Sequence, residues 1–268
     1  MQVVEANKDV VSVGDERILD AEGLAIKFFG HTISLYYLYK GISVRDQGLA
    51  ICDFVDPSSI NVVGRASIET FLTFHYVFVE PQTDEDKDLR YISWELAGLI
   101  ERQGFPARSP AGKKRLEDDK QLIESLRNKL KKNSVFDTLS NRQKRRLIER
   151  GEWRLKSWRE IILSAGLSKI HAESFYSYLC GYAHSGNLSI LQVRQTRTNQ
   201  ERRALIESTF SLMMIAMANI IKAYCAIFPK AKAMYTKVFP SKNVVDLWFE
   251  VGARSDEDID INWDEFQI

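Results

Sequence analysis

The stretch from Ser168 to Asn187, SKIHAESFYSYLCGYAHSGN, collects more chemically capable side chains than any other part of the chain. On a 3.6-residue repeat, one face of a helix would carry Glu173, Ser177, Cys180, Gly181 and His184. Imidazole titrates near neutral pH, so His184 could move protons if Glu173 or Glu69 orients it. The other interpretation is a structural histidine that hydrogen-bonds to nearby tyrosine hydroxyls.

A metal site at this helix is a weaker hypothesis. Cys180 and His184 lie one turn apart and could both reach a zinc ion. Structural zinc usually has two close pairs of ligands, whereas the other histidines and cysteines stand alone in the sequence. We therefore expect no metal ion and no cofactor. The motifs GxxxxGK[ST], GxGxxG, HExxH and GxSxG are also absent, which argues against the common nucleotide-hydrolysing, zinc-protease and serine-hydrolase chemistries.

A second polar pair lies much earlier in the chain. In the segment from Ser58 to Glu80, the β-branched and aromatic residues from Phe71 to Val79 would suit a strand. The spacing of Ile68, Leu72, His75 and Val79 by three and four residues instead favours a helix. On that helix Arg65 and Glu69 are four residues apart, so their side chains can form an ion pair.

These two segments carry a family resemblance. GRASIETF, with Arg65 and Glu69, and the later YSYLCGYAHSG resemble a bacterial family of helical proteins of unknown function. That family has a helix with Arg-x-x-x-Glu and a later helix with a Tyr-rich run before His, and it looks related to the HEPN superfamily. HEPN domains include toxin, antiviral-defence and RNA-processing ribonucleases. The likeness extends from about Leu19 to Phe228 and implies a helical bundle of the HEPN kind.

The resemblance also implies a chemistry, with one departure. HEPN nucleases usually carry Arg, then four to six residues, then His on one helix. Arg holds the phosphate and His moves protons while the ribose 2′-hydroxyl attacks, without a metal ion. Here Tyr178 and Leu179 occupy the region where that Arg would stand before His184. Arg65, oriented by Glu69, would have to supply the cation from another helix. The predicted catalytic residues are His184, Arg65, Glu69 and Tyr178.

Charge is unevenly distributed along the chain, although its formal net charge is only +1. The segment 113–159 has sixteen Lys and Arg against seven Asp and Glu, an excess of +9. Tryptophans interleaved with arginines suit base stacking combined with phosphate contacts. The predicted nucleic-acid-binding residues are Arg142, Lys144, Arg145, Arg146, Arg150, Arg154, Trp153 and Trp158. Alternatively, the tryptophans anchor short helices and the charges form a solvated face.

The segment 250–268 has seven acidic residues against one Arg. Residues 255–268 would form an acidic, flexible tail. The alternative is a docking peptide whose apolar side chains enter a pocket on this chain or on a partner. Its predicted partner-binding residues are Ile261, Trp263 and Phe266.

The fold expected from these patterns is all-α, a compact bundle. One domain would cover residues 1–254, with a charged helical insertion at about 109–156. Predicted helices cover 15–40, 58–80, 84–102, 109–132, 140–150, 157–166, 168–186, 199–228, 230–238 and 242–251. We expect a turn or two of helix at 47–54 and a loop with some extended character at 187–197.

The three cysteines stand far apart in apolar surroundings, and the N-terminal residues lack the pattern of a signal peptide. The uncharged, strongly apolar run 208–221 is shorter than the roughly 20 residues that span a bilayer. These features predict a cytoplasmic protein without a membrane segment, and a homodimer is expected because such bundles often pair through helix faces. Two functions follow: an RNA-binding protein or metal-independent ribonuclease of bacterial defence or stress, or a non-catalytic subunit that uses its charged helices and tail to bind a protein.

Overall fold

The computed structural model describes residues 16–46, 48–237 and 241–253. These residues form two compact units. The first unit contains the described residues up to His75 and those from Trp158 onward, and the second contains Tyr76–Ser157. The chain therefore leaves the first unit at His75 and returns to it at Trp158.

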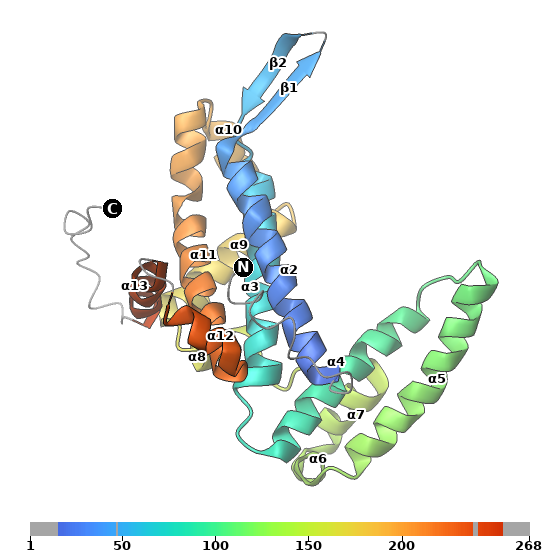
Figure 1. Cartoon of the computed structure of the whole chain (residues 1–268). Coiled ribbons are helices and arrows are strands. Elements are labelled where there is room, and N and C mark those ends of the chain that lie inside the picture. Colours follow the sequence, from blue (N-terminus) through green and yellow to red (C-terminus); the bar gives the residue numbers. More distant parts are fainter. Residues whose placement is uncertain (1–15, 47, 238–240, 254–268) are drawn as a thin grey trace. The chain divides into compact units, whose positions relative to one another are not determined.

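The first unit is a helical bundle that also carries a small hairpin (Figure 1). Before the second unit it contains α2 (Glu16–Lys40), β1 (Ile42–Asp46), β2 (Leu49–Phe54) and α3 (Pro57–Phe74). After it come α8 (Trp158–Ser164), η2 (His171–Phe175), α9 (Tyr176–Ala183), α10 (Asn187–Gln195), α11 (Asn199–Ile227), α12 (Pro229–Tyr235) and α13 (Ser241–Ala253). The segments η2 and η1 (His75–Val79) are π-helical, and η1 continues α3 into the second unit.

Helix α3 is the centre of this bundle, because α2, α9 and α11 all pack against it. It begins where Pro57 follows Asp56, whose carboxylate accepts from the Ser58 amide at 3.0 Å. Most of its circumference is buried, so apolar residues cover more than one face. Gly64 lets α11 approach closely: a Cβ at this position would lie 2.9 Å from Thr209 Cγ2.

The second unit contains α4 (Asp84–Gln103), α5 (Pro110–Lys131), α6 (Ser134–Thr138) and α7 (Asn141–Arg150). Its core is formed by the buried side chains of Leu89, Leu96, Leu126, Leu130 and Leu147. Arg102 on α4 donates two hydrogen bonds of 2.6 Å to the Asp119 carboxylate on α5. These apolar and ionic contacts join α4 to the charged helices that follow it.

The structure confirms the all-α class, with one two-stranded antiparallel hairpin as the exception among the described elements. Most predicted helices are present within a few residues of their expected ends. The helix predicted at 47–54 is wrong, because β1 pairs with β2 and Gly48, at φ 83°, lies in the turn. The loop predicted at 187–197 is also wrong, since α10 begins directly after Gly186.

The predicted domain boundaries differ from the observed units. The sequence predicts one domain with an insertion at about 109–156, whereas the second unit starts at Tyr76. The physical reason is the apolar face of α4, which packs against α5, α6 and α7. The tail residues Ile261, Trp263 and Phe266 lie outside the described residues.

Candidate functional site

The candidate site begins with two side chains one turn apart on α3. Arg65 Nε donates to Glu69 Oε1 at 3.1 Å. The Arg65 side chain is 21% exposed and the Glu69 side chain is 31% exposed. The pair is therefore partly shielded from solvent, yet both members remain accessible.

His184 reaches this pair from the end of α9, which packs against α3. His184 is the C-cap residue that follows Ala183, the last residue of α9, and its amide donates to the Cys180 carbonyl at 3.0 Å. Ser185 then takes the left-handed conformation at φ 54°, and the Gly186 amide donates to the Gly181 carbonyl at 2.7 Å. This turn ends the helix and leaves the His184 imidazole exposed at its tip.

The imidazole and the guanidinium are in direct contact. Arg65 Nη1 lies 3.0 Å from His184 Nε2, although the two residues are 119 positions apart in the sequence. A guanidinium can only donate hydrogen bonds. Nε2 must therefore be the acceptor in this contact, which places the single ring proton of His184 on Nδ1.

Tyr176 completes the group from the first turn of α9. Its hydroxyl donates to Glu69 Oε1 at 2.8 Å. Burial, followed by the neighbouring Glu69 carboxylate, raises the pKa of Tyr176, so the phenol keeps its proton. Burial works against the charge on Arg65, but Glu69 and other neighbours outweigh it and raise the pKa of Arg65. We refer to Arg65, Glu69, Tyr176 and His184 as the Arg65–His184 cluster.

Tyr178, which was predicted from the sequence to belong to this group, lies elsewhere. Its hydroxyl donates to the Leu205 carbonyl of α11 at 3.4 Å, and its ring packs on Tyr182. Each residue turns an α-helix by about 100°, so a shift of two positions moves a side chain to a different face. The sequence signal for Tyr176 is its spacing: Tyr176, Cys180 and His184 follow one another at intervals of four residues, about one helical turn each.

Glu173 is also separate from the cluster. It forms an ion pair with Arg159 and lies 3.9 Å from Lys169. Of the two carboxylates considered for orienting His184, only Glu69 lies in the cluster, and it acts through Arg65. The cluster can thus place a fixed cation beside a neutral imidazole, a combination suited to holding an oxyanion and moving a proton.

Comparison with known proteins identifies the family of this chain. A family of unknown function (DUF5677) matches residues 31–202. The chain belongs to this family. The matched range contains all four members of the Arg65–His184 cluster and most of the helices that position them. No match was found among curated proteins or among solved structures.

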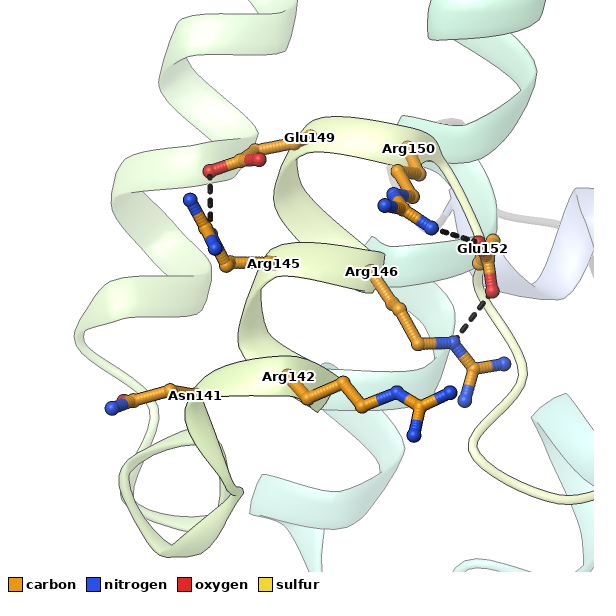
Figure 2. A pocket seen from close by; sticks show the side chains of 7 residues that line it. All are labelled: Asn141, Arg142, Arg145, Arg146, Glu149, Arg150 and Glu152. Atoms are coloured by element: carbon orange, nitrogen blue, oxygen red, sulfur yellow. Dashed lines mark hydrogen bonds and ion pairs between the residues drawn. The ribbon is translucent and has the colours of Figure 1, made fainter.

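A second candidate site of this DUF5677 protein lies on α7, in the second unit (Figure 2). A groove of about 710 Å³ is lined by Asn141, Arg142, Arg145, Arg146, Glu149, Arg150 and Glu152. Four arginines against two glutamates leave this lining with a formal charge of +2. We refer to these seven residues as the α7 groove.

The glutamates hold three of the arginines in place. Arg146 Nε donates to Glu152 at 2.5 Å, and Arg150 lies 3.7 Å from the same carboxylate. Arg145 lies 3.7 Å from Glu149. The Arg146 hydrogen bond lowers the pKa of Glu152, which keeps this carboxylate charged. The Arg145 side chain is 75% exposed, so the ion pairs leave much of its guanidinium open to solvent.

The other predicted nucleic-acid contacts lie outside the α7 groove. Lys144 donates to the Asp137 carbonyl at 3.0 Å, and Arg154 lies over the Trp153 ring. Trp153 packs edge-on against Tyr76 in the second unit, whereas Trp158 packs against Tyr176 in the first. Both tryptophans therefore have the anchoring contacts of the alternative interpretation.

Within residues 16–46, 48–237 and 241–253, no group of three or more His, Cys, Asp or Glu side chains is placed to hold a metal ion. Helix α11 is long and apolar enough to cross a membrane, but half of its most apolar window is buried within the protein. A core helix of a soluble protein meets the same criteria of length and composition. These criteria therefore do not distinguish a membrane-spanning helix from a core helix.

Proposed function

We propose that this protein is a HEPN-like, RNA-binding ribonuclease of bacterial defence or stress that acts without a metal ion. The observation that carries the proposal is the 3.0 Å contact between Arg65 Nη1 and His184 Nε2. Two helices distant in the sequence supply the guanidinium and the imidazole that HEPN nucleases carry on one helix. Exposure of His184 gives a substrate access to the pair.

The contact suggests how a phosphate would enter. A phosphate oxygen accepts the N–H that Arg65 otherwise gives to His184, because an anion is a stronger acceptor than a neutral imidazole. Glu69 holds Nε of the guanidinium throughout and thereby fixes its plane. Nε2 of His184 is then free to accept a proton.

The reaction that fits these groups is internal transesterification. The 2′-hydroxyl gives its proton to His184 Nε2 while its oxygen bonds to phosphorus, and the bond from phosphorus to the 5′-oxygen breaks. The departing 5′-oxygen takes a proton from water. The products are a 2′,3′-cyclic phosphate and a 5′-hydroxyl, and Arg65 offsets the charge that builds up on the phosphate.

The α7 groove supplies a separate reason to propose RNA binding. Its exposed arginines offer donors to several phosphates without reading the bases. Arg142 is exposed and has no hydrogen bond or ion pair to any other described residue, so its guanidinium is available to a phosphate. Loss of one phosphate contact should flatten the slope of log affinity against log salt by about 0.7 for a single strand.

One observation favours the second function, a non-catalytic interaction subunit. Arg65 already donates to Glu69 and contacts His184, and Tyr176 satisfies the same carboxylate. A cluster whose hydrogen bonds are already made can fasten α3 to α9 without any substrate. In that case the exposed charges of the second unit would bind a protein.

Cleavage of single-stranded RNA in the presence of a metal chelator tests the two functions. We expect the wild-type protein to cleave RNA, and Arg65→Gln and His184→Gln to lose cleavage by at least about a hundredfold, within the range of general acid–base catalysis. His171→Gln is the matched control, because His171 is held by Ser168 outside the cluster. A substrate with 2′-deoxyribose throughout should remain intact.

The result that overturns the ribonuclease proposal is equally direct. The ribonuclease proposal is wrong if the RNA substrate stays intact in all reactions although the wild-type protein is folded and binds RNA. The protein would then bind RNA without cleaving it. RNA binding that is absent, or that does not weaken as salt rises, would remove the α7 groove from the proposal as well.

A further inference from the structure

Helix α2 exposes a row of residues that the helical bundle does not use. Counting from Glu16, the row advances by alternating steps of three and four residues. All eight members are exposed: Glu16, Leu19, Gly23, Ile26, Gly30, Ile33, Tyr37 and Lys40. We refer to these eight residues as the α2 seam. Steps of three and four are the spacing by which one helix packs along another in a coiled coil.

The α2 seam is apolar between its charged ends. Leu19 is 47% exposed, Ile26 is 54% exposed and Ile33 is 42% exposed. Ala21, Ala25, Phe28 and Leu35 point the other way and are buried among the neighbouring helices. Helix α2 therefore has one apolar face in the bundle and a second one facing solvent. An amphipathic surface helix needs only the first of these.

Two glycines leave room along the α2 seam. A Cβ built on Gly23 or on Gly30 would meet no heavy atom within 4 Å. Glycine in a helix interior is destabilising by about 1 kcal/mol relative to alanine, so nothing in the bundle itself favours glycine here. Each glycine leaves a hollow next to an isoleucine that projects from the same face.

We propose that a second copy of this protein occupies the α2 seam, with the two α2 helices antiparallel across a two-fold axis near residue 28. In this pairing, a residue of one copy faces the residue of the second copy for which the two residue numbers add up to 56. Ile26 then fits the hollow over Gly30 of the second copy, and Ile33 fits the hollow over Gly23. Leu19 meets Tyr37, and one surface is complementary to itself, as two-fold symmetry requires.

Charge supports the antiparallel direction. Glu16 faces Lys40 of the second copy at both ends of the α2 seam, because their numbers also add up to 56. The pairing brings the acidic start of each helix against the basic end of the other, which also agrees with the helix dipoles. A parallel pairing would place Glu16 against Glu16 and Lys40 against Lys40.

The apolar area of the seam is a substantial part of such an interface. Tyr37 is 64% exposed, and at about 200 Å² per tyrosine it exposes roughly 130 Å². The three aliphatic residues of the seam add roughly twice that area. A standard interface buries about 800 Å² on each partner, so the apolar part of the seam supplies about half of that area.

A neighbouring groove extends the same surface. A cavity of about 310 Å³ lies between α2 and α11, lined in part by Phe29, Ile33, Tyr36, Ile220 and Ile221. Ile33 belongs to both the groove and the α2 seam. A second copy placed along the seam would also cover this apolar groove.

Sedimentation velocity over a wide range of protein concentration tests the proposal on the full chain. We expect a dimer whose dissociation constant rises at least about tenfold in Ile26→Glu and in Ile33→Glu, equivalent to about 1.4 kcal/mol or more. Both sites are exposed, so melting temperature should stay near the wild-type value. Ile190→Glu, on α10 and 51% exposed, is the matched control and should not change dimerisation.

Charge exchange tests the antiparallel pairing itself. Glu16→Lys alone and Lys40→Glu alone should each weaken the dimer, and the double variant should restore it. Wild-type protein that stays monomeric at all concentrations would overturn the proposal and leave the seam to residues 1–15 or to a different protein. The proposal would also be wrong if neither isoleucine substitution changed the dissociation constant of the dimer. The same holds if the dimer of the double charge variant were no tighter than the dimers of the single variants.

Discussion

Substitution of Gly64 by alanine probes the contact by which α11 holds α3, the helix of Arg65. The new Cβ would lie 2.9 Å from Thr209 Cγ2, closer than carbon atoms normally approach. Thr209 is fully buried, and its hydroxyl donates to Asn61 Oδ1 at 2.5 Å. The threonine methyl group therefore cannot turn away without breaking a buried hydrogen bond.

The expected magnitude combines three effects. Alanine gains about 1 kcal/mol over glycine in a helix interior. Overpacking a filled core costs about 1–3 kcal/mol, and a broken buried hydrogen bond costs about 1–3 kcal/mol more. Gly64→Ala should therefore lower the free energy of unfolding by about 1–5 kcal/mol.

Gly181→Ala is the matched control on α9, the helix that carries His184. A Cβ on Gly181 would meet no heavy atom within 4 Å, so only the helix-propensity gain remains. This variant should be more stable than wild type by up to about 1 kcal/mol. Urea unfolding of both variants, compared through their midpoints at equal slope, measures the difference. If Gly64→Ala proves as stable as Gly181→Ala, the close packing of α3 on α11 is incorrect.

Two further predictions concern buried charge and buried imidazole. Burial, with a further contribution from Lys27, lowers the pKa of His31, whose Nδ1 is buried without a hydrogen-bond partner. The unfolded chain then binds a proton on His31 more readily than the folded chain does. The free energy of unfolding should therefore fall as the pH drops below about 6.5. In His31→Leu this free energy should fall less steeply with pH. Thermal unfolding at neutral pH and at about pH 5 compares the two, and equal slopes would contradict the assignment. Arg102→Ala should cost about 1–3 kcal/mol in urea unfolding, because it leaves the buried Asp119 carboxylate without its two hydrogen bonds. Asp119→Asn removes the charge together with the salt bridge and should cost less; the opposite order would show that the buried charge is not the cause.

Three of the four cluster members, Arg65, Glu69 and His184, could be predicted from the sequence for reasons that the structure explains. Arg65 and Glu69 are four residues apart on one helix, which fixes their contact locally. His184 stands at a helix end marked by Gly186, a position that exposes it. The contact between Arg65 and His184 depends on how α3 crosses α9, which no local pattern determines. Its role in chemistry remains a prediction.

Tyr176 was missed for the same reason. Both Tyr176 and Tyr178 are compatible with a helix before His184, and only the direction of α3 decides which hydroxyl reaches Glu69. The hairpin at 42–54 was missed because two short strands depend on each other rather than on a local repeat. Helix α10 exposes Leu188, Ile190 and Val193, so its sequence lacks the clear buried face that predicts a helix.

The most direct test of the central claim is the NMR signal of the His184 imidazole during titration with a 2′-O-methyl RNA strand, which can bind but cannot undergo attack by its own 2′-oxygen. A phosphate that takes the Arg65 N–H must release His184 Nε2, so the His184 ring resonances should shift as RNA binds, while those of His171 should not. In Arg65→Gln the shift should disappear. If RNA binds the wild-type protein and the His184 ring resonances stay in place, the Arg65–His184 cluster does not hold the phosphate and the proposed site is wrong.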